Sequence, residues 1–413
     1  MWKKIPFLGL GLLPGMVLFS TAVHAAPYSA LEAHSFSMGG TGVASSTRAA
    51  APFYNPALLA AGPMPEEISL HVPMAGARFY DKEKVDDALD SYQLTGLEAE
   101  LDEAVNAYVA ANTSDTRNTL GVSANTLRQR LLFMDGKPME REFFGAVVIG
   151  VPHDSIGIAL MANAQVIGGA QVFASDNDLD GLQGMLEALS NGTLSSDPSQ
   201  LFSSNDLTST LNGRGLTFGE LGLSLAREIP VFGHDIAFGV TPKYRWVTSF
   251  DYATELNTAD FEIDLGEREH TAFDVDIGAA KHYNNGWRTG VAIKNLIGQE
   301  YTTVRGNVIR VEPQARLAAS HSTQWTTVAL DLDLNEAQGV GLSSDTQYIA
   351  VGAELDVFTM MQFRIGYRHN MANTETSIAT FGMGFTLVGI QLDLAAGASD
   401  DEINYAAQMG FEF

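Results

Sequence analysis

The sequence predicts an all-β fold, a transmembrane antiparallel β-barrel of about fourteen strands. Three observations predict it. The first residues have the layout of an export signal, most of the chain after residue 140 breaks into short segments of alternating apolar and polar residues, and the last segment is apolar and ends in Phe413. Such alternation is typical of strands that face lipid on one side and a polar lumen on the other.

The N-terminus predicts export. Two lysines precede an apolar run over residues 5–19, and small residues follow it near Ala25. This is the layout of a secretory signal peptide, and we expect cleavage after Ala25, with the equally small Ala26 as the alternative. A retained membrane anchor is the competing interpretation, although the run is short and contains two prolines. The predicted division of the chain is a signal peptide over 1–25, a hatch over 26–65 and an outer-membrane barrel over 66–413.

The composition excludes several function classes. Cysteine is absent and the formal net charge is -25. Without thiols the chain has no disulfide or thiol redox chemistry, and a closed barrel is a source of stability because every strand edge in it is hydrogen-bonded. An acidic balance leaves no surplus of cations to neutralise phosphates, so we expect no nucleic-acid partner.

No motif recommends an enzyme. The run Gly222-Leu223-Ser224-Leu225-Ala226 loosely resembles a serine nucleophile elbow, but no helix is predicted to follow it. The nine histidines show no paired spacing of the kind that binds zinc. We therefore expect no enzyme activity, no metal and no cofactor.

Charges of both signs share one face of the predicted strands. In residues 236–246, large apolar residues take one face, while Lys243 and Arg245 take the other. A Lys or Arg facing lipid would cost roughly 2–4 kcal/mol near the bilayer midplane, so the charged face is predicted to line the lumen, where opposite charges can pair across strands. The predicted lumen charges are Lys243, Arg245, Asp274, Asp276, Asp331, Asp333, Arg364 and Arg368.

The spacing of the alternating segments predicts the topology. We expect strands near residues 66–79, 141–151, 156–168, 215–228, 234–250, 269–282, 287–297, 308–320, 324–335, 345–356, 361–371, 377–386, 389–398 and 403–413. The connections alternate between short and long, which predicts periplasmic termini and long extracellular loops. Pro242 and Pro313 fall inside predicted strands, where each removes a ladder hydrogen bond, so we expect a bulge or kink at both.

The first two long loops are expected to contain helices. Apolar residues recur at helical spacing near residues 85–108 and again near 182–189. These helices either lie over or into the barrel mouth or pack only on one another, and the sequence leaves both arrangements open.

The last segment predicts how the barrel is assembled. Its apolar face carries Tyr405, Met409, Phe411 and Phe413. An apolar strand with a terminal aromatic residue resembles the signal read by the outer-membrane assembly machinery. We therefore expect that machinery and outer-membrane lipid as partners.

The segment before the first strand is rich in glycine and alanine. It contains Met38-Gly39-Gly40-Thr41-Gly42-Val43-Ala44 and Tyr54-Asn55-Pro56-Ala57-Leu58-Leu59-Ala60. The glycines permit close packing inside a lumen, and proline biases the asparagine before it towards extended geometry. The Asn-Pro-Ala motif is either a turn that holds the segment or a ligand contact. The predicted hatch residues are Gly39, Gly40, Gly42, Asn55, Pro56 and Ala57.

These motifs carry a family resemblance. A glycine-rich stretch followed by Asn-Pro-Ala resembles the hatch of the FadL class of long-chain fatty-acid transporters, barrels plugged by their N-terminal segment. Together with residues 85–93, the two motifs look more closely like the TraF-type conjugal-transfer family of predicted outer-membrane barrels. The same family name is used for a thioredoxin-like periplasmic protein, whose thiol chemistry a chain without cysteine cannot perform.

The resemblance implies a hatch-gated channel for small hydrophobic molecules in the outer membrane, with a kinked strand as one way to open a side passage. The alternative is an outer-membrane component of a conjugal-transfer or secretion apparatus, whose proteins would then be partners. A surface protein whose loops serve adhesion is a third hypothesis.

Overall fold

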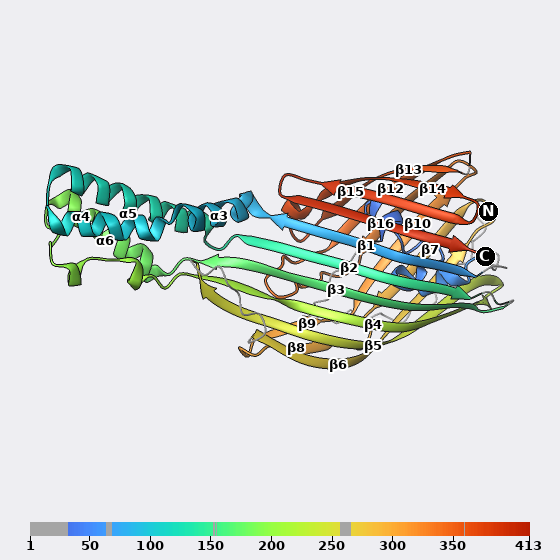
Figure 1. The fold of residues 1–413 in the computed structure, drawn as a ribbon. Helices are drawn as coiled ribbons and strands as arrows, with labels where there is room; N and C mark the ends of the chain where they lie inside the picture. Colours follow the sequence, from blue (N-terminus) through green and yellow to red (C-terminus); the bar gives the residue numbers. More distant parts are fainter. Residues whose placement is uncertain (1–31, 63–67, 152, 154, 257–265, 359) are drawn as a thin grey trace, which may run out of the picture.

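The computed structural model describes residues 32–413 apart from 63–67, 152, 154, 257–265 and 359. The predicted signal peptide, 1–25, lies outside the described residues, as do the two ends of the predicted hatch, 26–31 and 63–65. Fourteen strands close into one antiparallel barrel, in which the last strand pairs with the first (Figure 1). The predicted fold class is therefore confirmed.

Neighbours in the chain are neighbours in the barrel, except that β7 pairs with β10. Each of the fourteen predicted segments overlaps one barrel strand. The barrel strands are β1 (Ser69–Asp81), β2 (Pro138–Val151), β3 (Gly157–Phe173), β4 (Thr210–Val231), β5 (His234–Glu255), β6 (Glu267–His282), β7 (Trp287–Lys294), β10 (Gln314–Ser322), β11 (Thr326–Asp333), β12 (Tyr348–Val357), β13 (Met361–Asn370), β14 (Ile378–Leu387), β15 (Ile390–Ala398) and β16 (Glu402–Glu412).

The strand predicted near residues 308–320 is in fact two strands. Its first part, β9 (Val308–Val311), pairs with β8 (Gln299–Thr302) in a separate two-stranded sheet, and only its second part is a barrel strand. Pro313 lies between them. Because proline has no N–H to donate and a fixed φ, pairing ends before it and a new register begins after it.

At Pro242, where a bulge or kink was expected, the ladder of β4 with β5 is interrupted for two positions but its register does not shift. The pairing of β4 with β5 keeps one register from Gly222–Lys243 to Leu225–Val240. A register shift occurs instead in β1, between His71 and Met74, against both neighbouring strands. The chain there contains Pro73, which lacks the N–H that a regular ladder would use.

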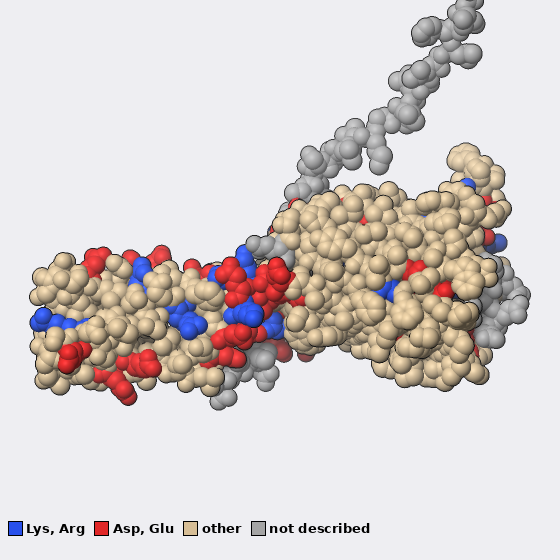
Figure 2. Space-filling view, turned by 90° about the horizontal axis from the view of Figure 1, so that it is seen from above, with Lys and Arg blue, Asp and Glu red and all other residues tan. Residues whose placement is uncertain are grey.

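Side chains alternate between the lumen and the outer wall. On β5, Lys243 and Arg245 are buried inside, while Tyr244 and Trp246 are 43% and 51% exposed outside. Figure 2 shows the consequence on the face that it presents: the barrel wall carries few charges, which gather on the helices and where the helices meet the barrel. An apolar wall around a polar interior is the arrangement that suits a barrel in lipid.

The two longest connections form a helical bundle that projects from the barrel, at the end opposite the C-terminus (Figure 1). The first contains α3 (Val85–Thr95), α4 (Leu97–Ala110) and α5 (Ser114–Met134), and the second contains α6 (Asp176–Asn191). Their buried residues form one core, which also includes a few residues at the strand ends. The helices therefore pack on one another rather than across the barrel mouth.

Helix α5 was not predicted, although Leu120, Ala124, Leu127 and Leu131 recur at helical spacing and are fully buried. No helix in the part of the chain that the structure describes is long and apolar enough to cross a membrane. The remaining short helices, of which those labelled η are 3-10 helices, are α1 (Ala33–Ser37), α2 (Ala51–Tyr54), η1 (Pro56–Leu59), η2 (Lys82–Lys84), η3 (Pro198–Gln200), η4 (Ser204–Asp206) and η6 (Thr374–Thr376).

Candidate functional site

The N-terminal residues 32–62, which we call the lumen segment, lie inside the barrel. They contain α1, α2 and η1, and nearly all of them are buried. Helix α1 packs against β13–β16 and η1 against β3–β6. The segment therefore spans the lumen from one side of the barrel to the opposite side. Glu32 caps α1 by accepting hydrogen bonds from the backbone N–H groups of His34 and Ser35, at 3.0 and 2.9 Å.

Asn55 joins two parts of the lumen segment to the wall. Its side-chain oxygen accepts a hydrogen bond from the backbone N–H of Ala57, at 3.1 Å, which starts η1 at Pro56. Its side-chain NH2 donates to the carbonyls of Val43 and of Ala279 on β6, at 2.9 and 3.2 Å. The asparagine is fully buried, so this geometry is that of a turn that holds the segment.

The barrel strands carry glycine at many positions where they contact the lumen segment. At seven glycines on the strands, an added Cβ atom would lie only 2.0–2.6 Å from an atom of the segment. These glycines are Gly157, Gly239, Gly278, Gly290, Gly352, Gly366 and Gly382. Contacts this close let the backbone of the segment rest directly on the strands, which side chains would prevent.

The predicted hatch glycines belong to the lumen segment and contact the wall from inside the barrel. Gly39 and Gly40 have φ of 74° and 85°, which glycine adopts without strain, and a Cβ on Gly39 would meet the backbone of β13 at 2.8 Å. A Cβ on Gly42 would lie 2.3 Å from the ring of Tyr54. The glycine-rich motif therefore folds tightly both on itself and on the barrel.

Polar side chains on the wall bind the backbone of the segment. Asp331 on β11 accepts from the N–H groups of Gly42 and Val43, each at 3.0 Å. Thr380 on β14 accepts from the N–H of Gly39 at 2.9 Å and donates to the carbonyl of Ser37 at 3.1 Å. These contacts satisfy backbone groups that would otherwise be buried without a partner.

The other predicted lumen charges form ion pairs across strands. Lys243 on β5 pairs with Asp276 on β6 at 2.9 Å, and Arg245 pairs with Asp274 at 3.0 Å. Both cations also contact Glu220 on β4. All five side chains are buried, so each charge depends on the others for compensation.

A second group of pairs lies on the opposite side of the lumen. Asp333 pairs with Arg316 on β10, Arg364 with Glu354 and with Asp393, and Arg368 with Glu402. Glu402 also pairs with Arg78 on β1, at 3.0 Å. Five of these partners, and Glu220 in the first group, were missing from the predicted set. The strand alternation could have identified them, because each occupies a lumen-facing position of its strand.

The end of the lumen nearest the helical bundle is filled by two connections. The β8–β9 hairpin packs Tyr301, Ile309 and Val311 against lumen-facing residues of β3–β5. The connection from β11 to β12 also reaches inside, where the backbone N–H and side-chain hydroxyl of Ser344 both donate to Glu140 on β2, at 2.8 and 2.7 Å. The sequence carried no signal for either arrangement.

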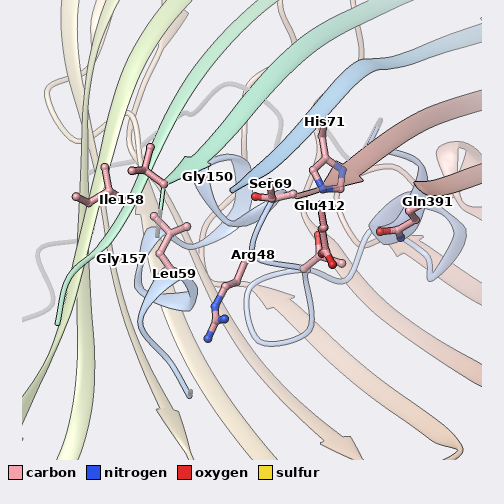
Figure 3. A pocket seen from close by; sticks show the side chains of 12 residues that line it. Arg48, Leu59, Ser69, His71, Gly150, Gly157, Ile158, Gln391 and Glu412 are labelled. Atoms are coloured by element: carbon pink, nitrogen blue, oxygen red, sulfur yellow. The ribbon is translucent and has the colours of Figure 1, made fainter. Parts of the chain in front are cut away.

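A cavity of about 450 Å³ lies at the other end, near the C-terminus. Figure 3 shows Leu59 and Arg48 of the lumen segment on one side, and Ser69 and His71 of β1 with Glu412 of β16 on the other. The bulge in β1 falls at this place. The lumen segment therefore leaves space beside β1 and β2, while it rests closely on most of the remaining wall.

An apolar layer separates this cavity from the charged lumen. Beyond the layer are two small cavities of about 30 and 40 Å³, both lined by Glu220 and Lys294. The layer contains Phe53 of the lumen segment, whose ring meets that of Phe144 on β2 edge to face, with centroids 5.5 Å apart. On the wall it continues with Val148 on β2, fully buried in the same cluster.

The predicted assembly residues Tyr405, Met409, Phe411 and Phe413 alternate with the buried residues of β16 and share its outward face. Phe413 exchanges backbone hydrogen bonds with Ile68, at 3.0 and 3.1 Å, beside the seam that closes the barrel. Among the described side chains no group of three or more His, Asp or Glu could hold a metal ion.

Residues 52–333 match the protein family described as "F plasmid transfer operon, TraF, protein". The match covers more than half of the chain. The chain belongs to this TraF family. The matched region begins in α2 and ends with β11, so it includes Asn55, the helical bundle and the ion pairs of Lys243 and Arg245, but not Gly39 or Arg364.

The barrel of this TraF-family chain is also similar to solved channel structures. The "TodX deltaS2S3 mutant monoaromatic hydrocarbon channel" has a TM-score of 0.50 at 11% identity, over 92% of this chain and 98% of that one. The P. putida toluene transporter TodX has 0.46 at 12%, over 93% and 99%, and a Pseudomonas aeruginosa FadL homologue has 0.47 at 10%, over 95% and 98%. At 11% identity, the first of these similarities shows a shared fold alone. A comparison of the sequence with curated proteins finds no match.

Proposed function

We propose that this protein is an outer-membrane channel for small hydrophobic molecules, and that the lumen segment, as part of residues 26–65, is its hatch. The observation that supports this most is that the lumen segment packs closely against some strands of the barrel and not against others. It rests on glycines around most of the wall, but beside β1 and β2 it leaves a cavity of about 450 Å³. The apolar outer wall supports a location in lipid.

The layer beside this cavity favours an apolar solute. On the inner face of β2, Phe144 lines a small cavity above the layer and Gly150 lines the large cavity below it. The inward residues between them are Ala146 and Val148, both buried in the apolar cluster. An apolar constriction opposes water and ions and accepts an apolar molecule. A solute entering from the end nearest the helical bundle also has to pass the β8–β9 hairpin.

The TodX variant with TM-score 0.50 is described as a monoaromatic hydrocarbon channel, which supports this class of solute through fold similarity. Lipid and the outer-membrane assembly machinery follow as partners, the second through the apolar outward face of β16. Export through a signal peptide over residues 1–25 belongs to the same proposal.

The test is uptake of toluene by outer-membrane vesicles that keep their lipopolysaccharide leaflet, with ion conductance measured in planar bilayers. Phe53→Ala removes one ring of the apolar layer, so we expect ion conductance above that of the wild type. Ala159→Leu adds bulk to the same layer from β3 and should lower toluene uptake. Ala318→Leu is the matched control, because Ala318 is also buried against the lumen segment but lies on β10.

Toluene uptake no faster than into outer-membrane vesicles that lack this protein would contradict the proposed channel. Equal loss of uptake in the Ala159 and Ala318 variants would contradict this route, but not the channel itself.

One observation favours the alternative, an outer-membrane component of a conjugal-transfer apparatus. The helical bundle projects from the barrel with a core of its own, and it exposes Leu94 on α3 and Val122 on α5, at 87% and 58%. Replacing both with Asp spares that core. Loss of conjugal DNA transfer with unchanged toluene uptake would favour this alternative over the channel.

A further inference from the structure

A second large cavity, of about 370 Å³, lies outside the lumen, where helix α3 meets the barrel wall. Leu89 of α3 lines one side. On the wall it is lined by outward-facing residues of neighbouring strands, among them Val166 of β3, Leu211 of β4 and Phe250 of β5. Val166 alternates with Gln165 and Ile167, which are buried on the lumen side. This cavity is therefore separate from the one beside the lumen segment.

The cavity exists because two aromatic rings lie flat on the wall. A Cβ on Gly168 or Gly215 would be 2.6 or 2.5 Å from Cζ of Phe250, and a Cβ on Gly213 would be 2.2 Å from the ring of Tyr252. Larger residues at these positions would lift the rings into the space beside α3. The three glycines thus let the two rings lie close to the strands, where they form the apolar floor of the cavity and leave the volume beside α3 open.

The rim of the cavity is acidic. Asp86 and Asp90 of α3 both line it, and the one cation among its described lining residues, Arg141, pairs with Asp86. Arg141 also donates to the carbonyl of Tyr80, at 3.1 Å. Figure 2 shows charges of both signs gathered at this junction of helices and barrel. With the arginine compensated, Asp90 leaves the rim negative, which disfavours a carboxylate or phosphate group there.

We propose that this cavity is a binding site for a small uncharged molecule with an apolar body. Its volume lies within the range of small-molecule sites, roughly 300–1,000 Å³, and its floor is apolar and aromatic. The acidic rim distinguishes the ligand from fatty acids and from phospholipids. The site lies on the outer wall and does not depend on passage through the lumen.

The test is photolabelling of the folded protein in nanodiscs with an uncharged aromatic diazirine, 3-trifluoromethyl-3-phenyldiazirine, followed by mapping of the labelled peptides. We expect saturable labelling of peptides containing Leu89 and Val166. Val166→Trp fills the cavity and should weaken the apparent affinity about tenfold or more. Ala162→Trp is the matched control, because Ala162 is exposed on the same outward face of β3.

A second variant covers the case in which Val166→Trp does not fold. Gly168→Ala pushes the ring of Phe250 into the cavity and should weaken labelling in the same way. Labelling that rises without saturation, or that is equal in the wild type and both cavity variants, would overturn the site. Stronger saturable labelling by a diazirine fatty acid or phospholipid would overturn the proposed ligand class. Neither result depends on toluene uptake, so the channel is tested separately.

Discussion

The carboxylate of Asp331 accepts a hydrogen bond from the backbone N–H of Gly42, 289 positions away in the sequence, at 3.0 Å. The same oxygen accepts from the N–H of Val43, also at 3.0 Å. Asp333, two residues further along β11, instead pairs with Arg316. Two carboxylates on one face of one strand therefore have different roles, one holding the lumen segment and the other neutralising a wall cation.

Removing the Asp331 carboxylate should loosen the lumen segment. Asp331→Ala leaves two buried N–H groups without an acceptor, at a cost of about 1–3 kcal/mol each. We expect faster limited proteolysis within residues 32–62 and higher ion conductance, with the barrel still folded. Asp331→Asn keeps an acceptor oxygen and should have a smaller effect. A proteolysis pattern unchanged by Asp331→Ala would show that this contact does not hold the segment.

A methyl group added at a wall glycine that contacts the lumen segment should displace the segment. A Cβ on Gly366 would lie 2.0 Å from the backbone nitrogen of Gly39, which cannot move away as a flexible side chain could. Overpacking of this kind costs about 1–3 kcal/mol. We expect Gly366→Ala to lower the urea midpoint of the folded protein in lipid. Gly145→Ala on β2 is the control, because no described atom beyond its two chain neighbours lies within 4 Å of its added Cβ, and its midpoint should match the wild type.

Breaking the buried charge group should destabilise the barrel. Arg245→Met leaves Glu220 and Asp274 buried, and Lys243 compensates only part of their charge, so we expect a loss of about 3–5 kcal/mol in the free energy of unfolding. Arg310→Met also breaks an ion pair with a glutamate, but that pair is exposed, so no measurable loss is expected. Equal stability of the two variants would mean that the lumen charges are hydrated and interact weakly.

Alkaline pH should weaken the helical bundle through Tyr92. Burial, and then the hydrogen bond that its hydroxyl donates to Glu98, raise the pKa of Tyr92 above the ordinary value of about 10. Because the folded state holds this proton more tightly, the stabilisation is complete below the pKa of the unfolded chain and is lost as the pH rises above it. We expect the circular dichroism of the helices to show a thermal midpoint that falls above about pH 10.

Tyr92→Phe should reduce that fall, because the ionising group is gone. Tyr108→Phe is the matched control for the loss of a buried hydroxyl in the same bundle, since Tyr108 donates to the carbonyl of Leu194 at 2.9 Å. A fall of the same size in the wild type and in Tyr92→Phe would assign the alkaline sensitivity to other groups.

The strands could be predicted because their signal is local. Tyr244 and Trp246 face outward while Lys243 and Arg245 face inward, and this follows from the two-residue period of a strand and from the cost of a charge in lipid. Proline was a weaker signal. Pro242 is accommodated without a register shift, whereas the shift in β1 lies between His71 and Met74 and was not predicted.

The sequence by itself determined the closed barrel, the side of the wall on which the residues of regular strands such as β5 lie, and the presence of a glycine-rich segment before the first strand. Only the tertiary structure decided which charges pair, that Asp331 binds the segment, and where the cavities lie. The reason is physical. Alternation depends on each residue and its near neighbours, whereas a contact such as that of Gly366 with Gly39 depends on how the closed barrel places residues far apart in the chain.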